Sequence, residues 1–234
     1  MEYAYMKDSY MKELETEVKE VNGNKVILED TIFYPESGGQ ASDEGIIKRG
    51  NETFKMLEAK KEAGKIIHSL DKEGLKVGDK VFCILNWERR YKLMRSHTAE
   101  HIFSAIFENE LGALVTGNKL TTEKMRTDFN VEKLEREQIK EFIEKANNII
   151  KKNLPITTYS MTREEVEKKP EMVKLAMGLP PGIKILRILK IGNFNEQPDG
   201  GTHVKSTAEI GEIEFLDYET KGKNNKRVYV KLKP

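Results

Sequence analysis

Hydrophobic and polar residues alternate in short runs along the first third of the chain, which is the period-two pattern of β-strands. Glu17–Val21 and Lys25–Leu28 flank the turn signal Asn22-Gly23-Asn24 and are predicted to form a hairpin. Further strands are expected in runs separated by glycine-containing turns, at Gly45–Lys48, Thr53–Ala59, Lys65–Ser69 and Lys80–Leu85. We therefore expect residues 1–86 to form a small β-barrel domain, because closure of a barrel leaves no exposed sheet edge.

The spacing of apolar residues becomes helical after Asn86. Long helices are predicted at Trp87–Glu110 and Val131–Lys152, and shorter helical segments at Met161–Lys169 and Met172–Met177, followed by a loop at Leu179–Gly182. Strands are then expected at Ile185–Ile191, His203–Ser206, Ile210–Tyr218 and Arg227–Leu232. Residues 87–234 should thus form a second domain of helices packed on an antiparallel sheet, so the predicted fold class is α+β.

Composition narrows the class of protein. The chain has 234 residues, of which 38% are hydrophobic and 34% charged, and its formal net charge is +1. A nearly neutral chain has no strong overall field, so binding to a polyanion requires a local basic patch. Cys83 is the single cysteine, and no stretch approaches the length of a membrane span. These features predict a soluble, cytoplasmic protein with no intramolecular disulfide and no membrane partner.

Histidines carry the clearest chemical signal. His97 and His101 are four residues apart on the first long predicted helix, so both imidazoles project from one face. Asp199 and His203 have the same spacing around the pair Gly200-Gly201, which allows a tight loop. Together the four side chains could bind Zn²⁺ through three nitrogens and one oxygen, although such histidine pairs also occur as ordinary packing. His68 stands alone in a predicted strand and is interpreted as an ordinary surface or core histidine.

Five segments resemble the editing domain of alanyl-tRNA synthetase and its free-standing relatives, the AlaX alanyl-tRNA editing proteins. They occur in the family's order, and they are Thr31–Gln40, the helix Trp87–His101, Arg126–Phe129, the loop Asp199–Val204 and Lys221–Val228. The glycine-rich first segment is similar to that of the longer members, which have an N-terminal barrel. The resemblance implies a zinc-dependent deacylase that acts in trans on tRNA(Ala) mischarged with serine or glycine. Such mischarging occurs because the alanine-binding pocket of a synthetase rejects serine and glycine only weakly.

The resemblance also suggests residues for substrate and RNA. Gly38, Gly39 and Gln40 are candidates for the substrate entrance, with a tight barrel turn as the alternative. A small polar residue should recognise the seryl hydroxyl, and Thr116 is preferred over Thr98, Thr121 and Thr202. Phosphates of tRNA are expected to contact the hairpin cations Lys221, Lys223, Lys226 and Arg227 rather than Arg89, Arg90, Lys92 and Arg95 before the histidines.

One position departs from the family pattern. Asp199 stands where the family loop usually has cysteine, so an oxygen ligand replaces a softer thiolate. Asp199 could ligate zinc more weakly, favour another metal, or leave its place to water. Two rival functions therefore stay open: a metal-dependent hydrolase of small esters or amides, and a tRNA-binding module without catalysis.

Overall fold

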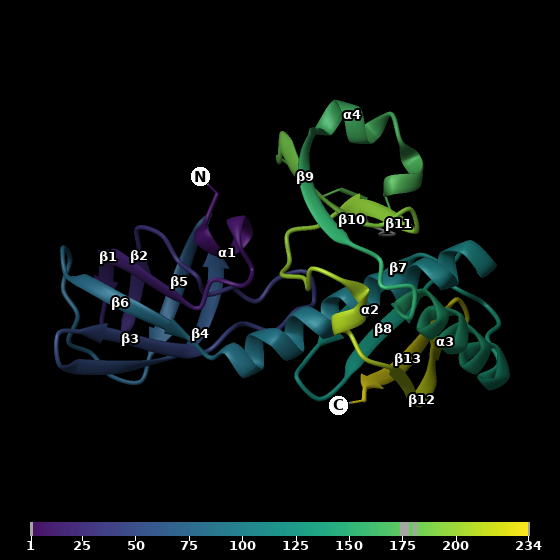
Figure 1. Cartoon of the computed structure of the whole chain (residues 1–234), viewed down its shortest axis with the longest axis horizontal. Helices are drawn as coiled ribbons and strands as arrows, with labels where there is room; N and C mark the ends of the chain where they lie inside the picture. Colours follow the sequence, from purple (N-terminus) through teal and green to yellow (C-terminus); the bar gives the residue numbers. More distant parts are fainter. Residues whose placement is uncertain (1, 174–177, 180–181, 234) are drawn as a thin grey trace. The chain divides into compact units, whose positions relative to one another are not determined.

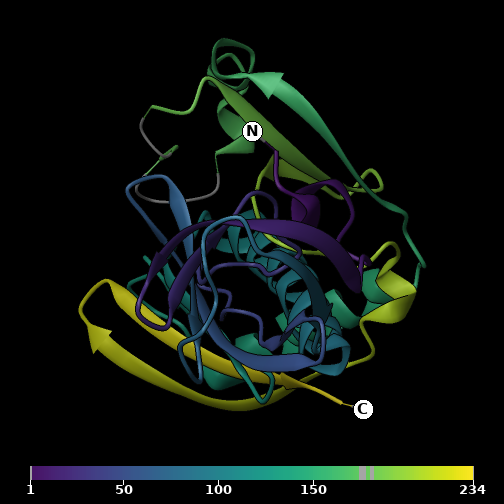
Figure 2. The same ribbon diagram turned by 90° about the vertical axis from the view of Figure 1, so that its left-hand side faces the viewer.

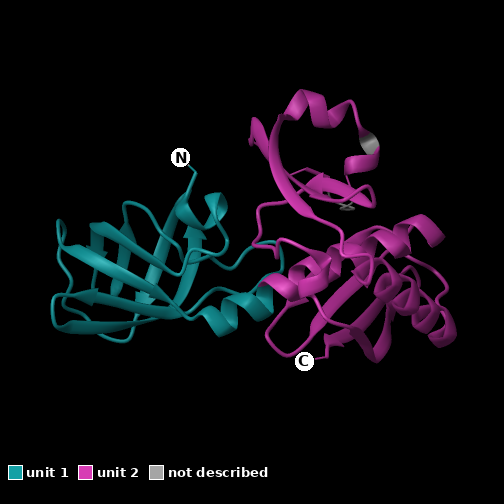
Figure 3. Ribbon diagram, viewed as in Figure 1, with its two compact units in different colours: residues 1–93 teal, residues 94–234 magenta. Residues whose placement is uncertain are grey.

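The computed structural model describes residues 2–173, 178–179 and 182–233, which fall into two compact units (Figure 3). Unit 1 is Met1–Leu93 and unit 2 is Met94–Pro234. The boundary falls inside one long helix, α2 (Trp87–Leu111). Most of the helical turn predicted at 172–177 and the middle of the loop predicted at 179–182 lie outside the described residues.

Unit 1 is built around a closed antiparallel barrel of six strands in the order β1-β2-β5-β4-β3-β6 (Figures 1 and 2). After a short helix, α1 (Ala4–Lys7), the strands are β1 (Glu13–Asn22), β2 (Lys25–Leu28), β3 (Gly45–Arg49), β4 (Glu52–Glu62), β5 (Lys65–Leu70) and β6 (Lys80–Leu85). Strand β6 pairs with both β1 and β3, which closes the barrel. The predicted Asn-Gly hairpin is present, with Gly23 in the left-handed region at a φ of 61°.

His68 is a core histidine of this barrel. Its ring is fully buried, and Nδ1 lies 3.2 Å from the carbonyl oxygen of Val26, to which it can only donate. Its Nε2 then accepts from the hydroxyl of Thr31 at 2.9 Å. Burial lowers the pKa of His68 to about 4, so the neutral ring is a packing element, which is the core alternative of the two that the sequence left open.

A buried ion pair joins the start of α2 to the loop between β2 and β3. The guanidinium of Arg90 and the carboxylate of Asp43 are both fully buried, and Nε donates to the two carboxylate oxygens at 3.1 and 3.0 Å. Arg90 also donates to the carbonyl oxygens of Ser9 and Ile32 at 2.9 and 2.5 Å. Because its donors are met by protein acceptors, Arg90 is a structural element of unit 1.

Unit 2 combines two antiparallel sheets with the rest of α2 and further helices. Its elements are β7 (Val115–Leu120), β8 (Met125–Phe129), α3 (Arg136–Ile150), β9 (Ile156–Thr162), α4 (Arg163–Glu167), η1 (Pro170–Met172), β10 (Ile185–Ile191), β11 (Asn195–Pro198), η2 (Thr207–Glu209), β12 (Ile213–Gly222) and β13 (Asn225–Leu232). One sheet has the order β12-β13-β8-β7 and the other β11-β10-β9. Strands β12 and β13 form a long hairpin, drawn in yellow in Figure 2.

An aromatic cluster holds the helices of unit 2 on the larger sheet. Phe107 of α2 stacks on Phe129 of β8 at a centroid distance of 4.1 Å, and Phe142 of α3 meets Phe107 edge-on at 5.0 Å. Both helices therefore cover the same face of this sheet. The side-chain amide of Asn147 fixes α3 further through hydrogen bonds of 2.9 and 2.8 Å to the backbone of Ile213.

The α+β fold class and the N-terminal barrel are confirmed. The strand predicted at His203–Ser206 is wrong, because this segment is a loop with one isolated bridge at Ser206. Four strands were not predicted, namely β7, β8, β9 and β11. Among the described residues, no helix is long and apolar enough to cross a membrane.

Candidate metal centre

Helix α2 places His97 and His101 one turn apart on the same face. The side-chain oxygen of Asn86 accepts from the Arg89 backbone N–H at 3.2 Å at the start of the helix. Gly112, at a φ of 64°, follows its last residue. The two imidazole centroids are 5.0 Å apart, and both rings are buried. The spacing predicted from the sequence is therefore realised by one unbroken helix.

The loop after β11 supplies Asp199 and His203. The backbone N–H of Asp199 donates to the carbonyl oxygen of Arg187 on β10 at 2.9 Å. The Arg187 guanidinium in turn donates to the carbonyl oxygen of Gly201 at 2.9 Å. These bonds hold the loop against strand β10, so the two side chains have defined positions.

The four predicted ligand residues converge. One ligand atom of each of His97, His101, Asp199 and His203 lies within 4.8 Å of the others. Oδ1 of Asp199 is 3.5 Å from Nε2 of both His97 and His101, and Oδ2 is 2.8 Å from Nε2 of His203. Residues from positions about 100 apart in the chain thus form one cluster, here called the metal centre.

Gly201 permits the close approach of the loop to α2. A Cβ atom at this position would lie 2.2 Å from Cε1 and 2.3 Å from Nδ1 of His97, far inside van der Waals contact. A Cβ at Gly200 would meet nothing within 4 Å. Of the two loop glycines, only Gly201 is therefore required by packing.

Thr98 determines which nitrogen of His203 faces the cluster. Its hydroxyl donates its one proton to the carbonyl oxygen of Met94 at 2.9 Å. It must therefore accept from Nδ1 of His203, at 3.1 Å, and it also accepts from the backbone N–H of Val204 at 3.4 Å. With its proton on Nδ1, neutral His203 has the lone pair of Nε2 available for a cation in the cluster, and such a cation would also be contacted by Asp199, whose Oδ2 lies 2.8 Å from Nε2.

Burial sets the protonation states in the centre. It lowers the pKa of His97 well below its ordinary value and that of His203 to about 4. Burial alone would raise the pKa of Asp199, but the surrounding imidazoles, with His97 the strongest, hold it well below its ordinary value. Burial by itself would lower the pKa of His101 as well, but the contact with Asp199 raises it above its ordinary value. Neutral imidazoles and an ionised carboxylate are the forms that bind a cation, so a metal ion competes with a proton at His101.

The residues present fit a divalent metal such as zinc. Both ring nitrogens of His101 are buried, and neither has a hydrogen-bond partner among the described residues. Three imidazole nitrogens and one carboxylate oxygen form a donor set that zinc accepts. In the part of the chain that the structure describes, this is the one group of histidine, cysteine and acidic side chains close enough together to hold a metal ion.

The predicted substrate-entrance residues form a tight turn in unit 1. Gly38 and Gly39 both have positive φ angles, of 56° and 82°. The backbone N–H of Gln40 donates to the carbonyl oxygen of Ser37 at 2.9 Å, and the reverse bond measures 3.2 Å. The glycines are thus required by the geometry of the turn.

The candidate threonines have different surroundings. Thr98 and Thr202 are fully buried, and the hydroxyl of Thr98 is engaged with His203. Thr121 closes the turn between β7 and β8 by donating to the carbonyl oxygen of Lys124 at 3.0 Å. Thr116 is exposed on β7.

The predicted basic hairpin is the end of β12 and β13. Lys223 is the most exposed of its cations, and Lys221 pairs with Glu219. Lys226 is buried and donates to the carbonyl oxygen of Lys223 at 3.1 Å, while Arg227 makes two bonds of 2.7 and 2.8 Å to Asp128. Two cations thus shape the hairpin and two face solvent.

Two buried polar residues beside the centre were missed. From the sequence, no role was predicted for Glu100 on α2 or for Gln197 on β11, and both side chains are buried. The signal for Glu100 was its position three residues before Phe103, on the apolar stripe of α2.

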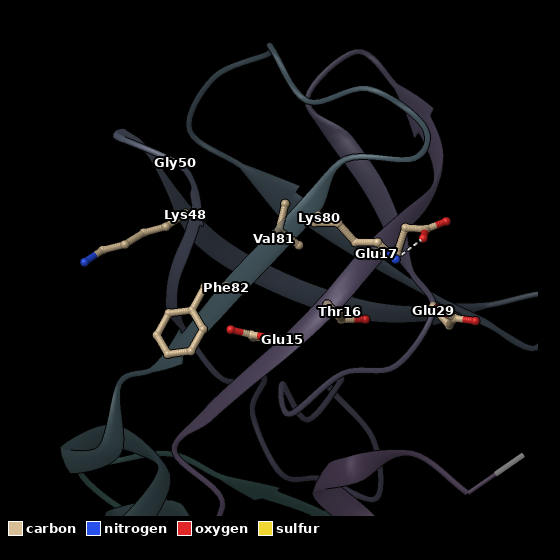
Figure 4. Close-up of a pocket in the computed structure, with 9 residues that line it drawn as sticks. All are labelled: Glu15, Thr16, Glu17, Glu29, Lys48, Gly50, Lys80, Val81 and Phe82. Carbon is tan, nitrogen blue, oxygen red and sulfur yellow. Dashed lines mark hydrogen bonds and ion pairs between the residues drawn. The ribbon is translucent and has the colours of Figure 1, made fainter.

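A hollow on the barrel has a different character (Figure 4). It is lined by charged residues of β1, β3 and β6, and its Lys80 and Glu17 form an ion pair. The hydrogen bonds from Lys80 and Lys19 lower the pKa of Glu17 to about 2. The described residues that line the hollow include no histidine or cysteine, so it offers no donor set comparable to the metal centre.

Comparison with known proteins identifies the family. Residues 2–89 match class II (A) tRNA synthetases, and residues 186–229 match the threonyl and alanyl tRNA synthetase second additional domain. The alanyl-tRNA editing protein AlaX-M of Saccharolobus solfataricus is 45% identical over all of this chain and 99% of its own length. The chain belongs to the AlaX-M family of alanyl-tRNA editing proteins.

Other relatives support the same grouping. The AlaX-M protein of Methanosarcina barkeri is 41% identical over 99% of this chain and 98% of its own length. The alanine–tRNA ligase of Saccharolobus islandicus is 37% identical over 93% of this chain, which corresponds to 25% of the ligase. This chain thus resembles one part of a much longer synthetase.

Replacing Gly201 with Ala should destabilise unit 2, because the new methyl group would overlap the imidazole of His97. We expect a loss of about 1–3 kcal/mol in the free energy of unfolding, measured with urea. The Gly200→Ala variant is the matched control and should unfold like the wild type. Equal stability of the two variants would show that the loop does not pack as described.

Proposed function

We propose that the chain hydrolyses the ester bond of tRNA(Ala) mischarged with serine or glycine, using zinc at the metal centre. The observation that carries this proposal is the convergence of His97, His101, Asp199 and His203 in a chain of the AlaX-M family. The names of the relatives supply the substrate class, because they describe proteins that edit alanyl-tRNA. The cluster of four donor side chains supports a metal-dependent reaction at this position.

The residues of the centre have separable roles in this proposal. His97, His101 and His203 hold the metal through neutral nitrogens, and Asp199 balances its charge. When bound, zinc supplies a Lewis acid beside the ester and can activate water. Thr98 keeps the proton of His203 on Nδ1, and the backbone N–H of Gly201 orients Asp199 by donating to Oδ2 at 2.5 Å.

Binding of tRNA is proposed to involve the hairpin of β12 and β13. Lys221 and Lys223 present their charges to solvent, whereas Lys226 and Arg227 keep the turn in shape. We also propose that the turn at Gly38, Gly39 and Gln40 borders the substrate entrance, and that Thr116 contacts the amino-acid side chain. In these roles the residues would position the aminoacyl ester for reaction at the metal centre.

The purified chain should deacylate Ser-tRNA(Ala) and Gly-tRNA(Ala) and spare Ala-tRNA(Ala), and a chelator should abolish the reaction. The assay measures release of labelled amino acid with and without added zinc. Rapid turnover of small aminoacyl esters without preference for tRNA would favour the general hydrolase. Binding of tRNA without deacylation by the zinc-loaded protein would favour the non-catalytic module, and either result contradicts the proposal.

Exchanges at Asp199 should change zinc affinity in opposite directions. Asp199→Ala should weaken binding by about 10–100-fold if the carboxylate acts only on the other ligands, and by more if it ligates directly. Asp199→Cys should tighten binding, because a thiolate is a softer donor. Competition with a chromophoric chelator measures both, and His68→Ala is the control that should bind zinc normally. Wild-type affinity in Asp199→Ala would refute the role given to this residue.

Charge reversal of Lys221 and Lys223 to Glu should weaken tRNA binding and reduce its salt dependence, since fewer phosphates are neutralised. The same exchange at Lys151 and Lys152, exposed at the end of α3, is the matched control. Affinities at several salt concentrations would be compared by filter binding. Equal losses in both double variants would mean that the hairpin has no special role.

A further inference from the structure

Glu100 is a carboxylate buried between the metal centre and the aromatic cluster. Its side chain is 4% exposed, and it precedes His101 directly on α2. On the same helix face follow Phe103 and Phe107, the second of which stacks on Phe129 of β8. Glu100 therefore occupies the end of the α2–β8 contact that adjoins the centre.

Thr127 and Gln197 are its polar neighbours in this region. Thr127 lies two residues before Phe129 and so on the same face of β8, and its hydroxyl opposes the rise in the pKa of Glu100 that burial causes. Gln197, 8% exposed, lies on β11 two residues before Asp199, so its side chain projects toward the same side of the chain as that member of the metal centre. Three elements thus bring a carboxylate, a hydroxyl and an amide to one side of the metal centre.

The hydrogen-bonding capacity of this group is not used up. Oε1 of Glu100 is buried, and no hydrogen-bond partner for it exists among the described residues. The same holds, within those residues, for Oε1 of Gln197. Two basic residues of unit 2 pair with other carboxylates, Lys145 with Glu110 and Arg227 with Asp128. Buried acceptors without donors cost free energy, so a ligand rich in donors is the complement that this arrangement lacks.

We propose that Glu100 and Gln197 bind the α-ammonium group of the aminoacyl ester. An ammonium group has three N–H donors and a positive charge, which matches two unused acceptor oxygens and a carboxylate. The neighbouring His101 would then lie beside the ester of the anchored residue. This inference rests on the proposed deacylase function and makes it specific for acyl groups that carry a free α-amine.

Charge removal at Glu100 tests the proposal through the substrate's amine. Wild type should prefer Ser-tRNA(Ala) to N-acetyl-Ser-tRNA(Ala), and Glu100→Gln should reduce this ratio of kcat/KM by about 10–100-fold. Glu110→Gln, an exchange near the end of the same helix, is the matched control and should keep the wild-type ratio. An unchanged ratio in an active Glu100→Gln variant would overturn the proposal and leave the deacylase function standing.

A binding measurement separates this inference from the proposed function. Adenosine carrying serine through a 3′-amide cannot be deacylated as an ester, and its affinity can be measured by calorimetry beside an analogue that lacks the amine. The zinc-loaded wild type should bind the amine-bearing compound about 10–100-fold more tightly, and Glu100→Gln should lose this difference. If the difference is lost although no ester is hydrolysed, the ammonium site stands and the deacylase function fails.

A second variant covers the case in which Glu100→Gln does not fold. Gln197→Met keeps the length of the side chain and removes the amide oxygen, so it should lower the amine preference in both measurements. Thermal unfolding establishes that each variant is folded before it is compared. A folded Gln197→Met protein with the full amine preference would overturn the part of the proposal that concerns Gln197.

Discussion

The close packing of the Asp199–His203 loop on helix α2 is the constraint on which the candidate site depends. The loop backbone passes so near His97 that position 201 has no room for a Cβ atom. Two anchors hold it there: Arg187 bonds its carbonyl oxygens, and Thr98 bonds His203 and Val204. Without this contact, His97 and His101 would be two histidines on the surface of a helix. With it, four donor side chains face each other.

Buried polar side chains differ between the two units in whether their hydrogen bonds are satisfied. In unit 1, Arg90, Asp43 and His68 are buried with hydrogen-bond partners, so they stabilise the barrel and offer no reactivity. In unit 2, His101 and Glu100 are buried with nitrogen or oxygen atoms that lack partners among the described residues. Unmet capacity is what a bound metal and a substrate can complete, which is why function is placed beside α2.

The aspartate at position 199 uses both of its oxygens. Oδ2 accepts from the backbone N–H of Gly201 and faces His203, while Oδ1 faces His97 and His101. A thiolate has a single donor atom and would lose one of these contacts. Compared with a thiolate, the carboxylate is a harder donor for zinc, but its second oxygen also hydrogen-bonds the loop backbone.

The fold class, the barrel and the four residues of the cluster that includes Asp199 could be predicted from the sequence by itself, since period-two alternation, helical spacing and a glycine pair are local signals. The sequence placed His97 and His101 on one helix face because four residues make about one turn. Only the tertiary structure decided that Arg90 is structural, that Arg227 is engaged by Asp128, and that Glu100 is buried without a partner for Oε1 among the described residues. The sequence does not show whether a charged residue lies on the surface or in the core, because this depends on long-range packing.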